Sequence, residues 1–216
     1  MCGITDFQGV DACIGVGVDQ IGLNFVPSSR RFVDLDTAVK LADRVCRRVP
    51  LVGVFMDQTK EEIDQVLKKV PLDAIQLHGH ESPEFCTRME RPVWKVFSVG
   101  YGWDPSIVRA YSTVAVHLYD TAAPNGSSGG TGKTFDWSLL PSNSPLPWYI
   151  AGGLTAENIS NAINLHRPDG LDLNSGVESA PGVKDPAKLE AVMAIISAWR
   201  TQAVVVGLPG RPGEGG

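Results

Sequence analysis

Residues Leu118–Trp137 read LYDTAAPNGSSGGTGKTFDW, and this stretch carries the pattern from which the fold is inferred. An apolar strand stops at a carboxylate, Asp120, and a loop with four glycines follows over residues 125–132. Asp136 and Trp137 then open a predicted helix that Asp136 can cap. A carboxylate at the carboxyl end of a buried strand, followed by a glycine-rich loop, is typical of the catalytic face of α/β enzymes. The alternative is a solvated linker before a capped helix.

Apolar segments of strand length alternate with segments of helical pattern along the rest of the chain. The predicted strands are Met1–Thr5, Gln20–Phe25, Leu51–Phe55, Ala74–Leu77, Val93–Val99, Val114–Leu118, Trp148–Ala151 and Gly170–Leu173. The clearest predicted helices are Asp6–Val18, Leu35–Val49, Thr59–Val70, Ser82–Met89, Pro105–Tyr111, Thr155–Leu165 and Pro186–Arg200. Fully apolar strands that alternate with helices indicate a parallel sheet covered by helices.

Eight such units in 216 residues predict an α/β fold, a small (β/α)₈ TIM barrel with a truncated first strand. An open, doubly wound sheet is the alternative, but its glycine fingerprint is missing. Gly15 and Gly17 are followed by Gln20 where the third glycine belongs. We expect one barrel domain over residues 1–202 and a flexible tail rich in glycine and proline over residues 203–216.

Composition excludes several classes of function. The net charge of −5 and the pI of about 5.3 argue against nucleic acid as the main partner. No apolar run reaches the roughly 18 residues that span a bilayer, and the N-terminus lacks a signal-peptide layout, so no membrane partner is expected. The four cysteines lack CxxC spacing, which argues against disulfides and structural zinc and favours a cytoplasmic protein.

In a barrel, the carboxyl ends of the strands and the loops that follow them share one face. The residues collected there are Cys2, Arg30, Arg31, Asp57, Gln76, His78, Asp120, Gly129–Gly132, Gly152, Gly153, Ser175 and Gly176. A thiol and a carboxylate that face each other across this mouth can divide the roles of base and acid. The thiol of Cys2 needs a positive field to become a thiolate, and the alternative is an inert buried cysteine.

Glycine-rich loops follow the last two strands. Gly152 and Gly153 come after one strand, and Asn174, Ser175 and Gly176 come after the next. Small residues let backbone N–H groups approach an anion, and the N-terminus of a short helix adds a favourable dipole, so both loops predict a phosphate site. The alternative is ordinary turn glycine.

Three other motifs give weaker evidence of a function. GGTGKT at 129–134 is not a P-loop, because Ser127 stands where that motif requires glycine; we expect a mobile loop that closes on a ligand. The Arg30 and Arg31 pair could clamp a carboxylate or form a solvated turn. His78, His80 and Glu81 are too few ligands for a metal site, so no metal is expected. Asp57 and Asp172 are interpreted as structural or hydrogen-bonding groups.

Several motifs together resemble one known family. They are CGIT at 2–5, GLNFVPSSRRFV at 22–33, VGVF at 52–55, QLHGHE at 76–81, DT and GGTGKTFDW within 120–137, AGGL at 151–154 and LDLNSGVES at 171–179. Their order and spacing resemble those of phosphoribosylanthranilate isomerase, a cofactor-free (β/α)₈ barrel of tryptophan biosynthesis. The resemblance runs from Met1 to about residue 200.

The resemblance implies an Amadori rearrangement of N-(5-phosphoribosyl)anthranilate to 1-(2-carboxyphenylamino)-1-deoxyribulose 5-phosphate. Asp120 would be the general acid, Cys2 the general base, and Arg31 the clamp for the anthranilate carboxylate. The expected substrate-binding residues are Arg31, Gln76, His78, Gly130, Thr131, Gly132, Gly152, Gly153, Asp172, Asn174, Ser175 and Gly176. The expected partner is a small phosphorylated substrate, with no metal or cofactor, and the protein is expected to be a monomer or a homodimer.

The start of the chain departs from the family pattern. Members usually have a longer first strand with a lysine two residues before the cysteine, whereas here only Met1 precedes Cys2. This departure supports the alternative of a barrel that binds phosphate without turnover. A related phosphoribosyl isomerase is a second, separate alternative. The related isomerase is expected to use paired aspartates, whereas the first strand here offers a cysteine.

Overall fold

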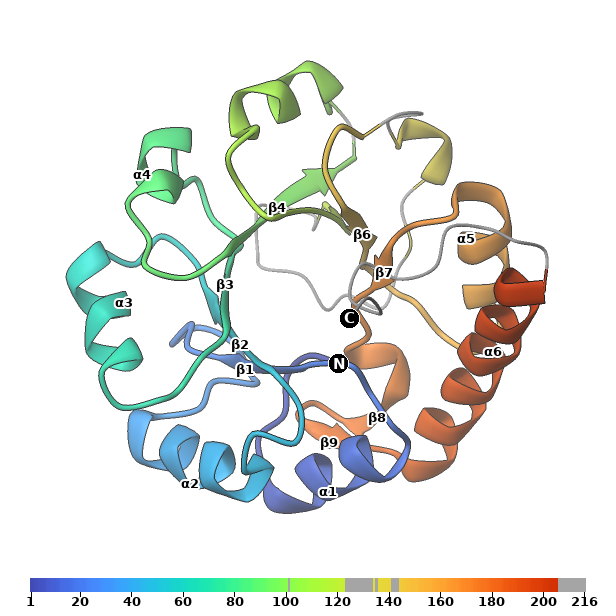
Figure 1. Cartoon of the computed structure of the whole chain (residues 1–216), viewed down its shortest axis with the longest axis horizontal. Coiled ribbons are helices and arrows are strands. Elements are labelled where there is room, and N and C mark those ends of the chain that lie inside the picture. Colours follow the sequence, from blue (N-terminus) through green and yellow to red (C-terminus); the bar gives the residue numbers. More distant parts are fainter. Residues whose placement is uncertain (101, 123–133, 135, 141–143, 206–216) are drawn as a thin grey trace.

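The chain folds into a ring of parallel strands surrounded by helices (Figure 1). The computed structural model describes residues 1–100, 102–122, 134, 136–140 and 144–205. Seven strands pair in sequence order in one parallel sheet: β1 (Ile21–Asn24), β2 (Leu51–Phe55), β3 (Ala74–Leu77), β4 (Val93–Val99), β5 (Val116–Thr121), β6 (Trp148–Ile150) and β7 (Gly170–Leu171). This order is that of a (β/α)₈ barrel, as the alternating pattern predicts.

Helices lie outside the strands. The α-helices are α1 (Phe7–Gly15), α2 (Leu35–Val45), α3 (Lys60–Leu67), α4 (Pro83–Thr87), α5 (Ile159–His166) and α6 (Pro186–Val205). Short 3₁₀ helices occur at η1 (Pro105–Tyr111), η3 (Trp137–Leu139) and η4 (Ser175–Val177). The helix predicted at 105–111 is therefore a 3₁₀ helix, and the one predicted after Asp136 is a single turn. Among the described residues, no helix is both long and apolar enough to cross a membrane.

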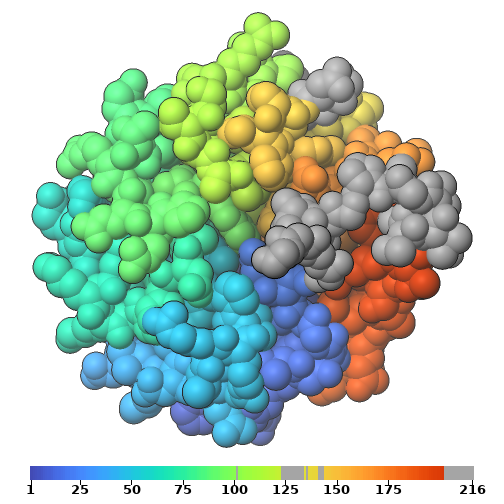
Figure 2. Space-filling model, viewed as in Figure 1, coloured from blue at the N-terminus to red at the C-terminus, as the bar shows by residue number. Residues whose placement is uncertain are grey.

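The predicted first strand is not a regular strand, which corrects that expectation. Its residues nevertheless join the two edges of the sheet. The backbone N–H of Cys2 donates to the carbonyl of Leu173 (2.8 Å), and that of Gly22 donates to the carbonyl of Met1 (2.7 Å). Gly3 has a φ of +70°, which interrupts the extended pairing. In Figure 2, the blue N-terminal residues lie beside the orange and red C-terminal part.

Local capping explains where several helices begin. Asp34, Thr59 and Ser82 each accept a hydrogen bond from a backbone N–H in the first turn of α2, α3 and α4, respectively. Thr59 forms a full capping box with Glu62. These polar side chains replace the backbone partners that the first turn lacks, so each helix begins where its cap lies.

The alternation of side chains along the strands creates two cores. Inside the ring, one cluster contains Val52, Ala74, Trp94, Val96, Val116, Leu118 and Ala151. A larger cluster packs between the strands and the helices and includes Tyr119, Ile75 and Leu77. Toward the carboxyl ends of the strands, inward-facing positions become polar at Gln76 and Asp120, so the apolar interior gives way to a functional cavity.

One element was not predicted. After η4 the chain forms an antiparallel hairpin of β8 (Glu178–Ala180) and β9 (Val183–Lys184), outside the parallel sheet. Gly182, with a φ of +84°, makes the tight turn between the two strands. The hydroxyl of Thr5 donates to the carbonyl of Gly182 (2.8 Å), so the N-terminal segment holds this hairpin in place.

Candidate active site

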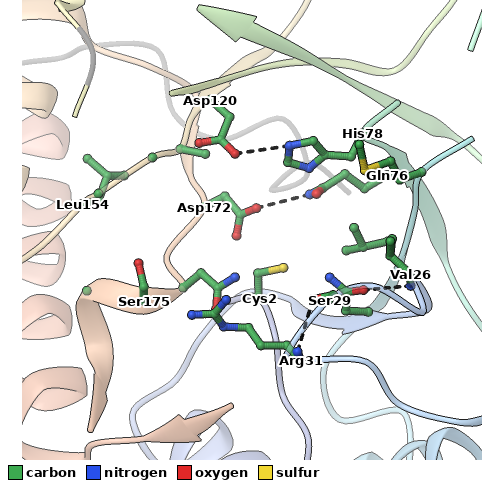
Figure 3. A pocket seen from close by; sticks show the side chains of 18 residues that line it. Cys2, Val26, Ser29, Arg31, Gln76, His78, Asp120, Leu154, Asp172 and Ser175 are labelled. Atoms are coloured by element: carbon green, nitrogen blue, oxygen red, sulfur yellow. Dashed lines mark hydrogen bonds and ion pairs between the residues drawn. The ribbon is translucent and has the colours of Figure 1, made fainter. Parts of the chain in front are cut away.

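A cavity with about 700 Å³ of empty space, open mouth included, lies at the carboxyl ends of the strands (Figure 3). The predicted residues that line it are Cys2, Arg31, Gln76, His78, Asp120, Gly152, Gly153, Asp172, Asn174, Ser175 and Gly176. The lining residues that the sequence did not single out are Asn24, Val26, Ser29, Val54, Met56, Ala151 and Leu154. Arg30 and Asp57 do not line this cavity, and Gly130, Thr131 and Gly132 lie outside the described residues.

Asp120 lies near the end of β5 with both carboxylate oxygens engaged. Its Oδ1 accepts from the backbone N–H of Thr121 (2.7 Å), and its Oδ2 lies 3.3 Å from Nε2 of His78. His78 follows β3, and its backbone N–H donates to the carbonyl of Phe55 (2.8 Å). The strand ends therefore hold an imidazole and a carboxylate within proton-transfer distance of each other inside the cavity.

The thiol of Cys2 is buried, with 7% of the residue exposed. Burial, and to a smaller extent the Asp172 carboxylate, raise its pKa to about 12, even though the N-terminal amine, Lys184 and Arg31 act in the opposite direction. The positive groups that a thiolate needs are therefore present, but burial outweighs them. At neutral pH the free site holds Cys2 as a neutral thiol.

Asp172 lies between Asp120 and Cys2 in Figure 3. Its Oδ2 accepts a hydrogen bond from Nε2 of Gln76 (3.2 Å). Burial raises the pKa of Asp172, while the N-terminal amine and Gln76 oppose that shift and the Asp120 carboxylate adds to it. Two carboxylates and an imidazole in one cavity give the site several groups able to bind or move protons, and the Gln76 amide holds one of the carboxylates.

Arg31 lies in the cavity wall, but its guanidinium already has a carboxylate partner. Its Nε donates to Oε1 of Glu178 (2.9 Å), and its Nη2 donates to Oε2 (2.6 Å). Nζ of Lys184 donates to the same carboxylate at Oε1 (2.8 Å). The sequence analysis identified neither Glu178 nor Lys184, because each is more than a hundred positions from Arg31 in the chain.

The glycine loops approach the cavity through backbone conformations that favour glycine. Gly152 and Gly153 have φ values of +82° and +62°. A Cβ added at Gly176 would lie only 1.9 Å from the carbonyl oxygen of Leu154, so the two loops pack backbone to backbone there. Asn158 fixes the first loop by donating to the carbonyl of Gly153 (2.8 Å). Both loops thus expose backbone at the mouth of the cavity.

A second buried ion pair supports the loop that carries His78. Nζ of Lys95 donates to Oε2 of Glu81 (2.7 Å) and to the carbonyl of Gly79 (2.6 Å). The Glu81 carboxylate also accepts from the N–H groups of Asp57 (2.9 Å) and Gly79 (3.0 Å). Lys95 is the feature of the sequence that could have indicated this ion pair, because it is the one charged residue in the largely apolar strand β4. Within the described ranges, no three His, Cys, Asp or Glu side chains form a metal-binding group.

The fold and the cavity define a class: (β/α)₈-barrel enzymes that carry acid–base groups and glycine loops at the carboxyl ends of their strands. The family model for N-(5'-phosphoribosyl)anthranilate (PRA) isomerase matches residues 1–194. The N-(5'-phosphoribosyl)anthranilate isomerase of Chromohalobacter salexigens is 40% identical over 204 residues, which cover 94% of each chain.

Two similar solved structures support the same assignment. One describes monomers generated from the dimeric phosphoribosylanthranilate isomerase of Thermotoga maritima, with 33% identity, a TM-score of 0.81, and coverage of 91% of this chain and 96% of that one. The other is a phosphoribosylanthranilate isomerase in complex with reduced 1-(o-carboxyphenylamino)-1-deoxyribulose 5-phosphate, with 31% identity, a TM-score of 0.80, and coverage of 91% and 96%.

The chain therefore belongs to the N-(5'-phosphoribosyl)anthranilate isomerase family of tryptophan biosynthesis. It is an isomerase that converts PRA to 1-(2-carboxyphenylamino)-1-deoxyribulose 5-phosphate. The family and the barrel fold that the motifs predict are confirmed.

Proposed function

We propose that Asp120 is the general acid and Cys2 the general base of this rearrangement. Asp120 protonates the ring oxygen of the ribose, and the bond from that oxygen to carbon 1 breaks. The lone pair of the anilino nitrogen then forms an iminium with carbon 1. The Cys2 thiol loses its proton to solvent, and the resulting thiolate removes the proton from carbon 2. The released electrons form a carbon 1–carbon 2 double bond, and the electrons of the iminium double bond return to nitrogen. The resulting enolamine loses its hydroxyl proton and gains one at carbon 1, which gives the ketone.

The observation that carries this proposal is that a thiol and a carboxylate of the predicted pair face one cavity. The high pKa of the thiol, about 12, is compatible with the role in the complex. The iminium is positively charged, so it favours the thiolate beside it and acidifies the proton on carbon 2. A thiolate of high pKa is also a strong base once it has formed.

Different residues are proposed to bind the two anionic groups of the substrate, its carboxylate and its phosphate. We propose that Arg31 holds the anthranilate carboxylate, and that Gly152, Gly153, Ser175 and Gly176 hold the phosphate through backbone N–H groups. Gln76, His78, Asp172 and Asn174 would then lie beside the sugar. The analogue bound by the relative carries both a carboxylate and a phosphate, which supports this arrangement.

Assembly and location remain predictions. The relative from Thermotoga maritima is dimeric, and this chain is proposed to be a monomer or a homodimer, which size-exclusion chromatography with light scattering would decide. All four cysteines are free, which supports the proposed cytoplasmic location.

The roles are tested by turnover of freshly generated PRA, followed as loss of its fluorescence. Cys2→Ser and Asp120→Asn should each lower kcat by about 10²–10⁴, the usual contribution of a positioned acid or base. Cys46→Ser and Asp43→Asn are matched controls, because both residues are exposed and away from the cavity. Both active-site variants should still bind the reduced product analogue. If either variant keeps near-wild-type kcat, the role proposed for that residue is wrong.

A further inference from the structure

Three buried charges form a chain behind one wall of the cavity. Glu178 lies between Arg31 and Lys184, and its carboxylate accepts hydrogen bonds from both. The three residues are 5–7% exposed, and the side chain of Lys184 is fully buried. Arg31 alone contacts the cavity, so the other two act behind it.

The β8–β9 hairpin builds this arrangement. Glu178 and Lys184 are directly opposed cross-strand partners, which places their side chains on the same face. Nζ of Lys184 also lies 3.2 Å from Oδ1 of Asn174, and Nζ of Lys188 donates to the backbone carbonyl of Glu178 (2.7 Å). The hairpin therefore fixes the position of Lys184 from several directions.

The charges explain why a second cation is needed there. Arg31 and Glu178 by themselves form a neutral pair, and a neutral pair attracts an incoming carboxylate weakly. Two further carboxylates, Asp120 and Asp172, line the same cavity and repel anions. Lys184 cancels the charge of Glu178, so the group of three keeps a net charge of +1.

Glu178 alone would suffice to align the guanidinium. It engages Nε and Nη2, whereas Nη1 makes no hydrogen bond to the described residues. Burying a lysine beside this pair carries a large desolvation penalty, so alignment alone gives no reason for it. A need to keep the positive charge of Arg31 available does give a reason for a buried lysine here.

We propose that Lys184 is a specificity-determining positioning residue: by neutralising Glu178 it leaves the positive charge of Arg31 available to a ligand carboxylate. The inference rests on the proposed role of Arg31 as the carboxylate clamp. Lys184 does not touch the substrate, and its effect is confined to ligands that carry the carboxylate.

The test compares two probes: reduced 1-(2-carboxyphenylamino)-1-deoxyribulose 5-phosphate and its counterpart with an unsubstituted phenyl ring. Lys184→Met should weaken binding of the carboxylate probe by about tenfold or more, as expected for a lost buried charge nearby. Binding of the counterpart should change by less than about twofold, because its phosphate is held elsewhere. Lys184→Arg should bind both probes nearly as well as the wild type.

The double variant Lys184→Met, Glu178→Gln separates charge from structure. It removes one positive and one negative charge, so Arg31 again carries the net charge of +1. We expect it to regain much of the preference for the carboxylate probe that Lys184→Met loses. A purely structural role predicts that the double variant is worse than the single one, and that result overturns the proposal. Equal weakening of both probes by Lys184→Met would also overturn it.

A further variant distinguishes this proposal from the proposed function. Arg31→Lys keeps a cation for Glu178 but loses the guanidinium fork. If Arg31→Lys lowers the preference for the carboxylate probe and Lys184→Met does not, the inference about Lys184 alone fails. If Arg31→Lys leaves that preference unchanged, the assignment of Arg31 as the clamp fails, and the inference about Lys184 fails with it. Circular dichroism and thermal melts establish that each variant is folded.

Discussion

Replacing Lys95 by methionine should destabilise the protein strongly, because Lys95 is half of a buried ion pair. Both side chains of the Lys95–Glu81 pair are only 3% exposed. Nζ of Lys95 makes three hydrogen bonds, to Glu81 and to the carbonyls of Leu77 (3.2 Å) and Gly79 (2.6 Å). Methionine fills a similar volume but leaves the Glu81 carboxylate buried with only backbone N–H partners.

Removing one partner of a buried ion pair typically costs about 3–5 kcal/mol. In a chain of this size 1 kcal/mol corresponds to roughly 2–4 °C in Tm, so we expect Lys95→Met to lower Tm by roughly 6–20 °C. Thermal unfolding followed by circular dichroism, with urea titration at 25 °C, measures this directly. The double variant Lys95→Met, Glu81→Met leaves no unpaired buried charge. Its loss of unfolding free energy should therefore be smaller than the sum of the losses in the two single variants.

Activity provides a second readout for the same variant. The pair anchors the residues that follow β3, and this segment carries His78 to its position 3.3 Å from Asp120. We expect kcat/KM to fall at temperatures where Lys95→Met is still fully folded. A loss of less than about 1 kcal/mol in unfolding free energy would contradict this prediction, because exposed ion pairs contribute no more than that.

The pKa shifts of Cys2, Asp172 and Glu178 have measurable consequences. With a pKa of about 12, Cys2 is ionised at pH 8 in about one molecule in 10⁴, so its alkylation by iodoacetamide, mapped by mass spectrometry, should rise about tenfold per pH unit from pH 7 to 10. Exposed Cys46 should react first, and a plateau for Cys2 below pH 9 would contradict this. The pKa of Asp172 is raised in the folded state, so its ionisation opposes folding at pH values above the unfolded-state pKa of about 3.8. Asp172→Asn should therefore raise Tm at pH 7, and a lower Tm would count against this. Burial raises the pKa of Glu178, but hydrogen bonds and charges from Arg31 and Lys184 outweigh it and lower the pKa overall. The stability that Glu178 contributes is thus present above pH 4.5 and is lost as pH falls through its lowered folded-state pKa. The difference in unfolding free energy between wild type and Glu178→Gln should therefore narrow in acid. A difference that stays constant with pH would contradict a lowered pKa.

The strand and helix pattern predicted the fold because several of the parallel strands are buried on both faces and leave apolar runs in the sequence. Residues 51–55 show this directly, since all five are buried in β2. The ends of elements were harder to predict. The helix predicted at 35–49 stops at Val45, because Cys46 and Arg47 adopt left-handed conformations with φ of +51° and +56° without a glycine to signal the turn. The division into a domain over 1–202 and a tail stays a prediction.

The rule that strand ends meet at one face of a barrel located most of the cavity. It brought Cys2, Gln76 and Asp120 together although they are far apart in the sequence. The same rule gives no pairing between side chains, so the contacts of Glu178 with Arg31 and Lys184 were not predictable. The raised pKa of Cys2 also depends on packing around the thiol, which no local pattern encodes.

A kinetic isotope effect distinguishes the acid role proposed for Asp120 from the base role proposed for Cys2. PRA carrying deuterium on carbon 2 of the ribose would be turned over by the wild type, Asp120→Asn and Cys2→Ser. If Asp120 opens the ring, its loss makes ring opening limiting, and the isotope effect on kcat should fall toward one. If Cys2 removes the proton, its loss makes that step limiting, and the isotope effect should reach its largest value. The reverse pattern, with a large effect in Asp120→Asn and none in Cys2→Ser, would contradict the assignment.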